Sequence, residues 1–209
     1  MKRIVLLFTF LTMLFVSAVV DAAPAVDGPT GLIAIPSADT LREGQVSLGY
    51  YKLDGARTGN FNMSITNQFE IGVAGLQFDN RRSDYFVNAK FSILPETILT
   101  PGLAAGILDA ANKKERTAYA VASKALPFGF RLHAGVGNGR YDGAFAAIEK
   151  VINPLSILTG NNVFPATTLI AEYDGKDFNY GARLSVVPGL KLDAGWRHDS
   201  TYFGISFTN

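Results

Sequence analysis

Three acidic residues in the C-terminal third of the chain, Glu172, Asp174 and Asp193, are of a type that could hydrolyse a glycosidic bond. Glycoside hydrolases place two carboxyl groups on either side of the scissile bond, one as an acid and the other as a nucleophile or base. The surrounding pattern favours a structural role. Four charged residues fall on the polar faces of neighbouring predicted strands, namely Glu172, Arg183, Asp193 and Arg197. Opposite charges in such positions can pair across the sheet. Ion pairing is therefore our first interpretation, a sugar or ion path the second, and catalysis the least favoured.

The run His198-Asp199-Ser200 contains the three residue types of a serine hydrolase triad in consecutive positions. Three consecutive residues in a turn cannot easily place the base between the nucleophile and the orienting acid, and triads assemble from distant segments. We interpret the run as a solvated turn, and His133, on the polar face of its strand, as a hydrogen-bonding residue. With two His and no Cys, the chain does not favour a transition-metal site. We therefore expect no enzyme activity, no metal and no cofactor.

The charged residues near the C-terminus must be positioned by a hairpin between Leu169 and Trp196. Apolar residues recur at every second position from Phe178 to Val186, and the pattern restarts after the turn at 187–189. Similar alternation predicts twelve strands along the chain, at about 44–53, 59–67, 69–78, 84–94, 101–109, 117–125, 129–137, 143–150, 166–174, 177–187, 189–197 and 201–208. One apolar and one charged face is typical of a membrane β-barrel with a polar lumen.

The connections between these strands separate into two alternating sets. Every connection of the first set is charged: 54–59, 79–83, 109–116, 138–143, 174–177 and 197–200. The second set contains only Glu96 and Lys150 as charges, and four of its five members hold proline. Alternate connections of an up-and-down barrel face opposite sides of the membrane, so this separation supports about twelve strands. The charged set would lie outside the cell and both termini in the periplasm. A secreted β-sandwich is the alternative fold.

The N-terminus indicates export. A basic start at Lys2-Arg3 precedes an apolar run from Ile4 to Val20 and a small-residue cleavage site. We expect a signal peptide at residues 1–22, a periplasmic segment at residues 23–43, and a transmembrane barrel at residues 44–209. Pro36 disfavours a central strand within the periplasmic segment. We therefore expect this segment to be tucked across the barrel mouth, with a first half-strand as the alternative.

Several segments resemble the YjbH-type family of outer-membrane proteins linked to exopolysaccharide production. They lie in order along the chain at residues 30–51, 101–110, 119–137 and 171–184, and include TGLIAIPSADTLREGQVSLGYY and AEYDGKDFNYGARL. The resemblance implies a transmembrane β-barrel whose partners include components of polysaccharide assembly or export. Family members are usually longer, whereas this chain looks like a single module.

Taken together, these features predict an antiparallel up-and-down β-barrel in the outer membrane, with a polar, ion-paired lumen. We expect a non-enzymatic accessory of exopolysaccharide biosynthesis or export, surrounded by outer-membrane lipid and in contact with polysaccharide and export proteins. The alternatives are a small diffusion channel and, less favoured, an enzyme that modifies lipid or glycan. The formal net charge of +1 gives no general reason to expect nucleic acid as a partner.

Overall fold

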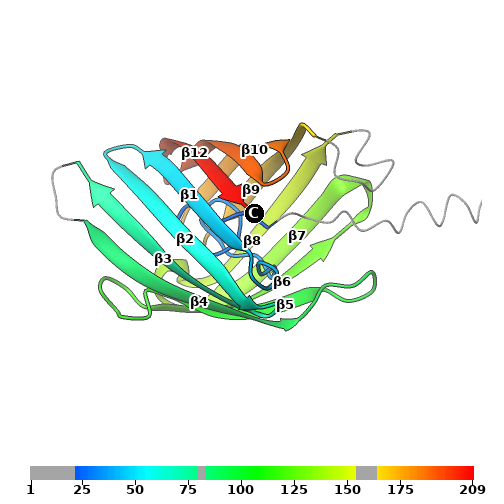
Figure 1. Ribbon diagram of the computed structural model, residues 1–209, viewed down its shortest axis with the longest axis horizontal. Coiled ribbons are helices and arrows are strands. Elements are labelled where there is room, and N and C mark those ends of the chain that lie inside the picture. Colours follow the sequence, from blue (N-terminus) through cyan, green and yellow to red (C-terminus); the bar gives the residue numbers. More distant parts are fainter. Residues whose placement is uncertain (1–21, 80–82, 154–163) are drawn as a thin grey trace, which may run out of the picture.

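The computed structural model describes residues 22–79, 83–153 and 164–209, and these residues form one closed antiparallel barrel (Figure 1). Each strand pairs with its neighbours in sequence, and the seam closes between the first and the last strand. The strands are β1 Val46–Leu53, β2 Ala56–Thr66, β3 Phe69–Phe78, β4 Asp84–Leu94, β5 Gly102–Leu108, β6 Thr117–Ala125, β7 Phe130–Gly137, β8 Gly143–Ile152, β9 Ala166–Tyr173, β10 Phe178–Val187, β11 Leu190–Arg197 and β12 Ser200–Thr208. Two short 3-10 turns, η1 Pro127–Gly129 and η2 Gly139–Tyr141, lie between strands. In the described ranges we find no helix with the length and apolar character needed to cross a membrane.

The predicted barrel and its twelve strands are confirmed, with small differences at the strand ends. The largest difference is in the first hairpin, where the sequence predicted a connection at residues 54–59. The structure starts β2 at Ala56, because Asp54 and Gly55 alone make the turn. Gly55 has a φ of 65°, a conformation that glycine adopts without steric penalty.

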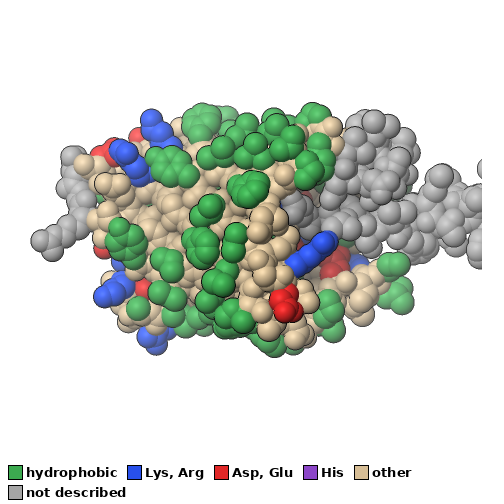
Figure 2. All heavy atoms as spheres, viewed as in Figure 1, with side chains coloured by type: hydrophobic (Ala, Val, Ile, Leu, Met, Phe, Trp, Pro, Cys, Tyr) green, Lys and Arg blue, Asp and Glu red, His purple; other side chains and the backbone are tan. Residues whose placement is uncertain are grey.

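Side chains alternate between the outside and the inside of the barrel. The outward positions carry large apolar side chains that are exposed, among them Leu48, Tyr50, Phe61, Val87, Phe91, Leu132, Ile148, Tyr180, Leu192, Trp196 and Phe203. The inward positions carry polar and charged residues that are buried, such as Asn62, Glu70, Lys90 and Glu172. Figure 2 shows hydrophobic side chains over the middle of the barrel wall and charged side chains towards its ends. The exterior thus suits a hydrocarbon environment and the interior a polar one.

The two ends of the barrel differ as the sequence predicted. One end, the charged rim, holds the connections after the odd-numbered strands, whose described residues are 54–55, 79 and 83, 109–116, 138–142, 174–177 and 198–199. The other end, the terminal rim, holds the connections after the even-numbered strands together with the C-terminal end of β12. Strict antiparallel pairing of consecutive strands places the two sets of connections at opposite ends.

Aromatic side chains in the lumen lie against glycines of nearby strands. The Tyr51 ring of β1 lies over Gly204 of β12, and Tyr202 places its ring against Gly195 and its hydroxyl against Gly181. The rings of Tyr119 and Phe145 cover Gly106 and Gly135 in the same way, so that this arrangement recurs on both sides of the barrel. A glycine without a Cβ lets the ring approach the backbone, which accounts for part of the chain's 21 glycines.

We expect Gly204→Ala to destabilise the barrel by about 1–3 kcal/mol, the usual range for overpacking a filled interior. A Cβ at Gly204 would overlap the Tyr51 ring, which is fully buried and held by the bond from its hydroxyl to the Pro24 carbonyl at 2.8 Å. The matched control is Gly59→Ala, because a Cβ there would have its nearest neighbour, the Gly49 carbonyl oxygen, 3.8 Å away. Denaturant unfolding in detergent measures both. Equal stability of the two variants would contradict the prediction.

Candidate functional site in the barrel lumen

The lumen is occupied by the chain itself. Residues 22–45, which we call the lumenal segment, run from the terminal rim into the ring of strands and back, and Figure 1 shows them in blue. From Ala23 to Ala38 every residue is buried except Asp27. Eight strands enclose little more than their own side chains, whereas sixteen leave an aqueous channel. Twelve strands leave room for an extra segment, and this segment takes it.

The lumenal segment forms no strand, only two isolated bridges, Pro24 to Thr30 and Gly31 to Pro36. It starts at the terminal rim, where the Thr208 hydroxyl donates to the Ala22 carbonyl at 3.2 Å. It reaches the charged rim at Asp27 and returns to the terminal rim, where the Gly44 amide donates to the Ser64 carbonyl. The segment therefore enters and leaves the barrel through the same mouth.

Two wall carboxylates bind the main-chain amides of the segment. Glu172 of β9 accepts hydrogen bonds from the amides of Ile33 at 3.0 Å and Ala34 at 2.6 Å. Glu70 of β3 accepts hydrogen bonds from the amides of Thr30 at 2.8 Å and Leu41 at 3.1 Å. Hydrogen bonds to an ionised group are about twice as strong as neutral ones. These two residues therefore hold the segment on two different parts of the wall.

Two wall cations bind its carbonyls. Arg183 of β10 donates to the Gly31 carbonyl at 3.1 Å and to the Leu32 carbonyl at 2.9 Å. Lys90 of β4 donates to the Thr30 carbonyl at 2.8 Å, and its Nζ lies 3.9 Å from Glu70. Each cation thus has a wall carboxylate beside it and a segment carbonyl in front of it.

The structure separates the four residues that the sequence analysis grouped. Arg183 and Asp193 lie directly opposite each other on β10 and β11, and their side chains pair at 2.7 Å. Glu172 is hydrogen-bonded to the segment and to Asn179, and Arg197 pairs with Asp27 of the segment. The four residues all face the lumen, but two of them bind the segment rather than each other.

Two aspartates of the segment are paired with wall arginines. Asp39 forms a bidentate pair with Arg131, at 2.6 and 2.7 Å, and Arg131 also binds Glu96 at 2.7 Å. Burial would raise the pKa of Asp39, but the Arg131 guanidinium outweighs it and holds that pKa well below its usual range. The pKa of Asp27 is lowered in the same way, because two arginines outweigh the effect of its burial. Both aspartates are therefore ionised at neutral pH.

Several residues that bind the segment were not identified as binding residues from the sequence. Asn60 donates to the Ala25 carbonyl at 2.9 Å and Asn62 to the Gly28 carbonyl at 2.5 Å. Glu70, Lys90 and Arg131 belong with them. The available signal was their position between apolar residues on predicted strands, which marks them as inward-facing. Their partners could not be inferred, because those partners are mostly main-chain atoms of a segment without regular structure.

Ser123, His133 and Glu149 lie together on β6, β7 and β8. The Ser123 hydroxyl is 2.8 Å from His133 Nδ1, and His133 Nε2 is 3.7 Å from Glu149. The Ser123 oxygen also accepts a hydrogen bond from the Ala38 amide at 2.8 Å. The segment thus covers the Ser123 hydroxyl, and the contact seen in the structure is the one that holds Ala38 against the wall.

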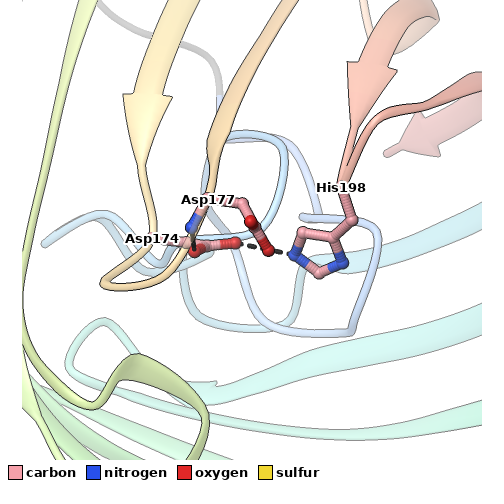
Figure 3. Close-up of side chains that lie close together, drawn as sticks. All are labelled: Asp174, Asp177 and His198. Carbon is pink, nitrogen blue, oxygen red and sulfur yellow. Dashed lines mark hydrogen bonds and ion pairs between the residues drawn. The ribbon is translucent and has the colours of Figure 1, made fainter.

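Asp174, Asp177 and His198 meet at the charged rim (Figure 3). Figure 3 shows the two aspartates on the β9–β10 hairpin and His198 on the neighbouring turn. The Asp174 carboxylate already accepts hydrogen bonds from His198 at 2.7 Å, from the Asn179 side chain, and from the amides of Lys176 and Asp177. Burial would raise the pKa of Asp174, but these donors prevail and lower it. A metal ion would have to displace them, so the cluster is best explained as a clamp between two turns.

The chain resembles porins in fold. A KdgM porin in complex with disordered oligogalacturonate superposes with a TM-score of 0.55 at 11% identity, covering 78% of this chain and 97% of the porin. A second KdgM porin structure gives a TM-score of 0.54 at 10% identity, with the same coverage. At such identities the likeness extends to the fold alone. A comparison with curated proteins gave no match.

The sequence profile described as exopolysaccharide biosynthesis protein YbjH matches residues 26–158, which is more than half of the chain and includes most of the lumenal segment. The protein therefore belongs to the YjbH family, as the sequence segments indicated.

Proposed function

We propose that this protein is an outer-membrane β-barrel that serves as a non-enzymatic accessory of exopolysaccharide biosynthesis or export. The apolar outer surface of the strands is suited to surrounding lipid, and the family description indicates the process. In this proposal residues 1–22 are a signal peptide, residues 23–43 enter the barrel from the periplasm, and residues 44–209 form the transmembrane domain. The charged rim then faces the outside of the cell.

The observation that carries this proposal is the occupied lumen. Glu70, Glu172 and Arg183 bind the main chain of the segment from different strands, and every residue from Ala23 to Ala38 except Asp27 is buried. Passive diffusion requires a continuous water-filled path, as in the wide porins. A barrel that holds its own chain in that path is better suited to an accessory role, in which partners meet its rims or displace the segment.

A porin-like diffusion channel is the second candidate. The similarity of the fold to KdgM porins favours it, and one of those porins was solved with oligogalacturonate, which also supports a polysaccharide as the partner of this barrel. An enzyme that modifies lipid or glycan is the third. The covered Ser123 hydroxyl and the fully hydrogen-bonded Asp174 carboxylate both argue against it.

Deletion of the gene in its native host tests the proposal. We expect exopolysaccharide in the culture medium to fall and to recover on complementation, while uptake of small neutral solutes stays the same. A porin would give the reverse result, with slower solute uptake and unchanged exopolysaccharide. Unchanged exopolysaccharide in the deletion strain would contradict the accessory role.

A further inference from the structure

Two arginines converge on one carboxylate oxygen at the charged rim. Arg140 of η2 and Arg197 at the end of β11 both contact Oδ2 of Asp27, Arg140 at 2.5 Å. Arg140 belongs to the β7–β8 connection, so the two guanidiniums come from opposite sides of the β9–β10 hairpin. The wall thus presents a pair of cations, and the lumenal segment supplies the anion.

The main chain that carries the two arginines is fixed by contacts within the wall and not by the segment. The Arg140 amide donates to the Thr117 hydroxyl at 3.0 Å, which fixes the η2 turn against β6. Arg197 pairs with Ser200 in the β11–β12 ladder. Its buried Nε has no hydrogen-bond partner among the described residues, so that Asp27 leaves part of the guanidinium unused. The Arg140 side chain keeps 35% of its surface exposed and the Arg197 side chain 11%, so the site can be reached from outside the barrel on the Arg140 side.

The chemistry of this pair favours an oxyanion, and the one that it holds in this structure is the Asp27 carboxylate. A guanidinium offers its N–H groups as a planar fork that matches a carboxylate, and two such groups side by side repel each other unless an anion lies between them. Two buried side-chain amides around this position are already engaged: Asn179 accepts from the His198 amide and donates to Glu172 and Asp174, and Asn88 donates to the Asp27 carbonyl at 3.4 Å.

We infer that Arg140 and Arg197 form a binding site for the carboxylate of an acidic sugar, and that Asp27 occupies this site in the closed barrel. The inference rests on the proposed function in one respect, namely that the ligand is a glycan. It adds the class of glycan, which carries uronic acids or other carboxylated sugars. It also gives Asp27 the role of an internal competitor for the same two guanidiniums.

Calorimetric titration of the purified full barrel in detergent tests the inference. The probe is a six-residue oligomer of glucuronic acid, maltohexaose is the neutral control, and inorganic phosphate tests for a general anion site. We expect Asp27→Ala to bind the hexauronate at least about 10-fold more tightly than the wild-type barrel, equivalent to about 1.4 kcal/mol. Asp27→Asn, which fills the space without the charge, should give a smaller gain.

The second substitution identifies the binding groups. Adding Arg197→Gln to Asp27→Ala should remove the gain, while heat-dependent gel migration shows that each variant is folded. Equal hexauronate affinity in wild type and Asp27→Ala would overturn the inference. So would an equal gain for maltohexaose, or phosphate binding as tight as that of the hexauronate.

The outcome is separable from that of the proposed function. Purified Asp27→Ala barrel could bind the hexauronate tightly while deletion of the gene leaves exopolysaccharide unchanged. That pair of results would support the binding site and reject the accessory role. A gene-dependent exopolysaccharide with no uronate binding would do the opposite.

Discussion

A barrel lacking residues 23–41 is expected to conduct ions in planar bilayers, whereas the full barrel shows little or no conductance. The deletion removes the main chain that Glu70, Glu172 and Arg183 hold, and leaves a lumen lined by charged and amide side chains that water can enter. Wall pairs such as Arg183 with Asp193 remain, so the wall keeps charges of both signs in balance. Stepwise current from the deletion variant, absent from the full barrel, is the measured result.

A disulfide lock is the matched control for the deletion. The chain has no cysteines, and a Cβ at Gly102 would lie 3.4 Å from the Ala38 Cβ, close to the 3.5–4.5 Å range of disulfides. We expect the oxidised Ala38→Cys, Gly102→Cys variant to show no current at any voltage. If it is silent and its reduced form shows occasional steps, those steps come from movement of the segment. A folded deletion variant without conductance would contradict the prediction.

Arg183→Ala is expected to lower the free energy of unfolding by about 3–5 kcal/mol, as for the loss of one partner from a buried pair. The substitution leaves the Asp193 carboxylate buried and unpaired, and Oδ2 of this carboxylate already has no hydrogen-bond partner among the described residues. It also removes the donors to the carbonyls of Gly31 and Leu32. The unfolding midpoint in detergent measures the effect.

Two variants show whether the buried charge is the cause. The double substitution Arg183→Met, Asp193→Leu removes both charges and should recover part of the loss, because apolar replacements of buried pairs are often neutral or stabilising. Arg57→Ala breaks the exposed pair with Asp79, whose side chains are more than half exposed, and should change stability by no more than about 1 kcal/mol. An Arg183→Ala barrel as stable as Arg57→Ala would mean that water reaches the Arg183 position.

The fold could be predicted from the sequence because strand period and turn chemistry are local properties. Alternation such as Phe178, Tyr180, Ala182 identifies the lipid-facing side of a strand. The alternating connections confirm the strand count, because one missed strand would have mixed the charged set with the uncharged set. The errors lie at strand ends, as at Ala56, where Gly55 makes a two-residue turn that the pattern alone does not specify.

The site could be predicted only in part. Facing polar residues on adjacent strands are within reach of sequence patterns, and Arg183 with Asp193 is such a pair. The bond from the Ala34 amide to Glu172 joins residues 138 positions apart and involves no side chain of the segment. Since any residue other than proline offers the same amide, the identities of residues 33 and 34 do not indicate that Glu172 is their partner.

The path of the lumenal segment has a consequence for assembly. Because the segment enters and leaves through the terminal rim, it forms a loop inserted into the lumen from one end and does not pass through the barrel. The strand pairs that close the seam between β1 and β12 therefore do not trap the segment. The loop at residues 23–41 has no ladder pairing with the wall strands, so it could leave through the terminal rim with the loss of its hydrogen bonds to the wall and of no pair between two strands.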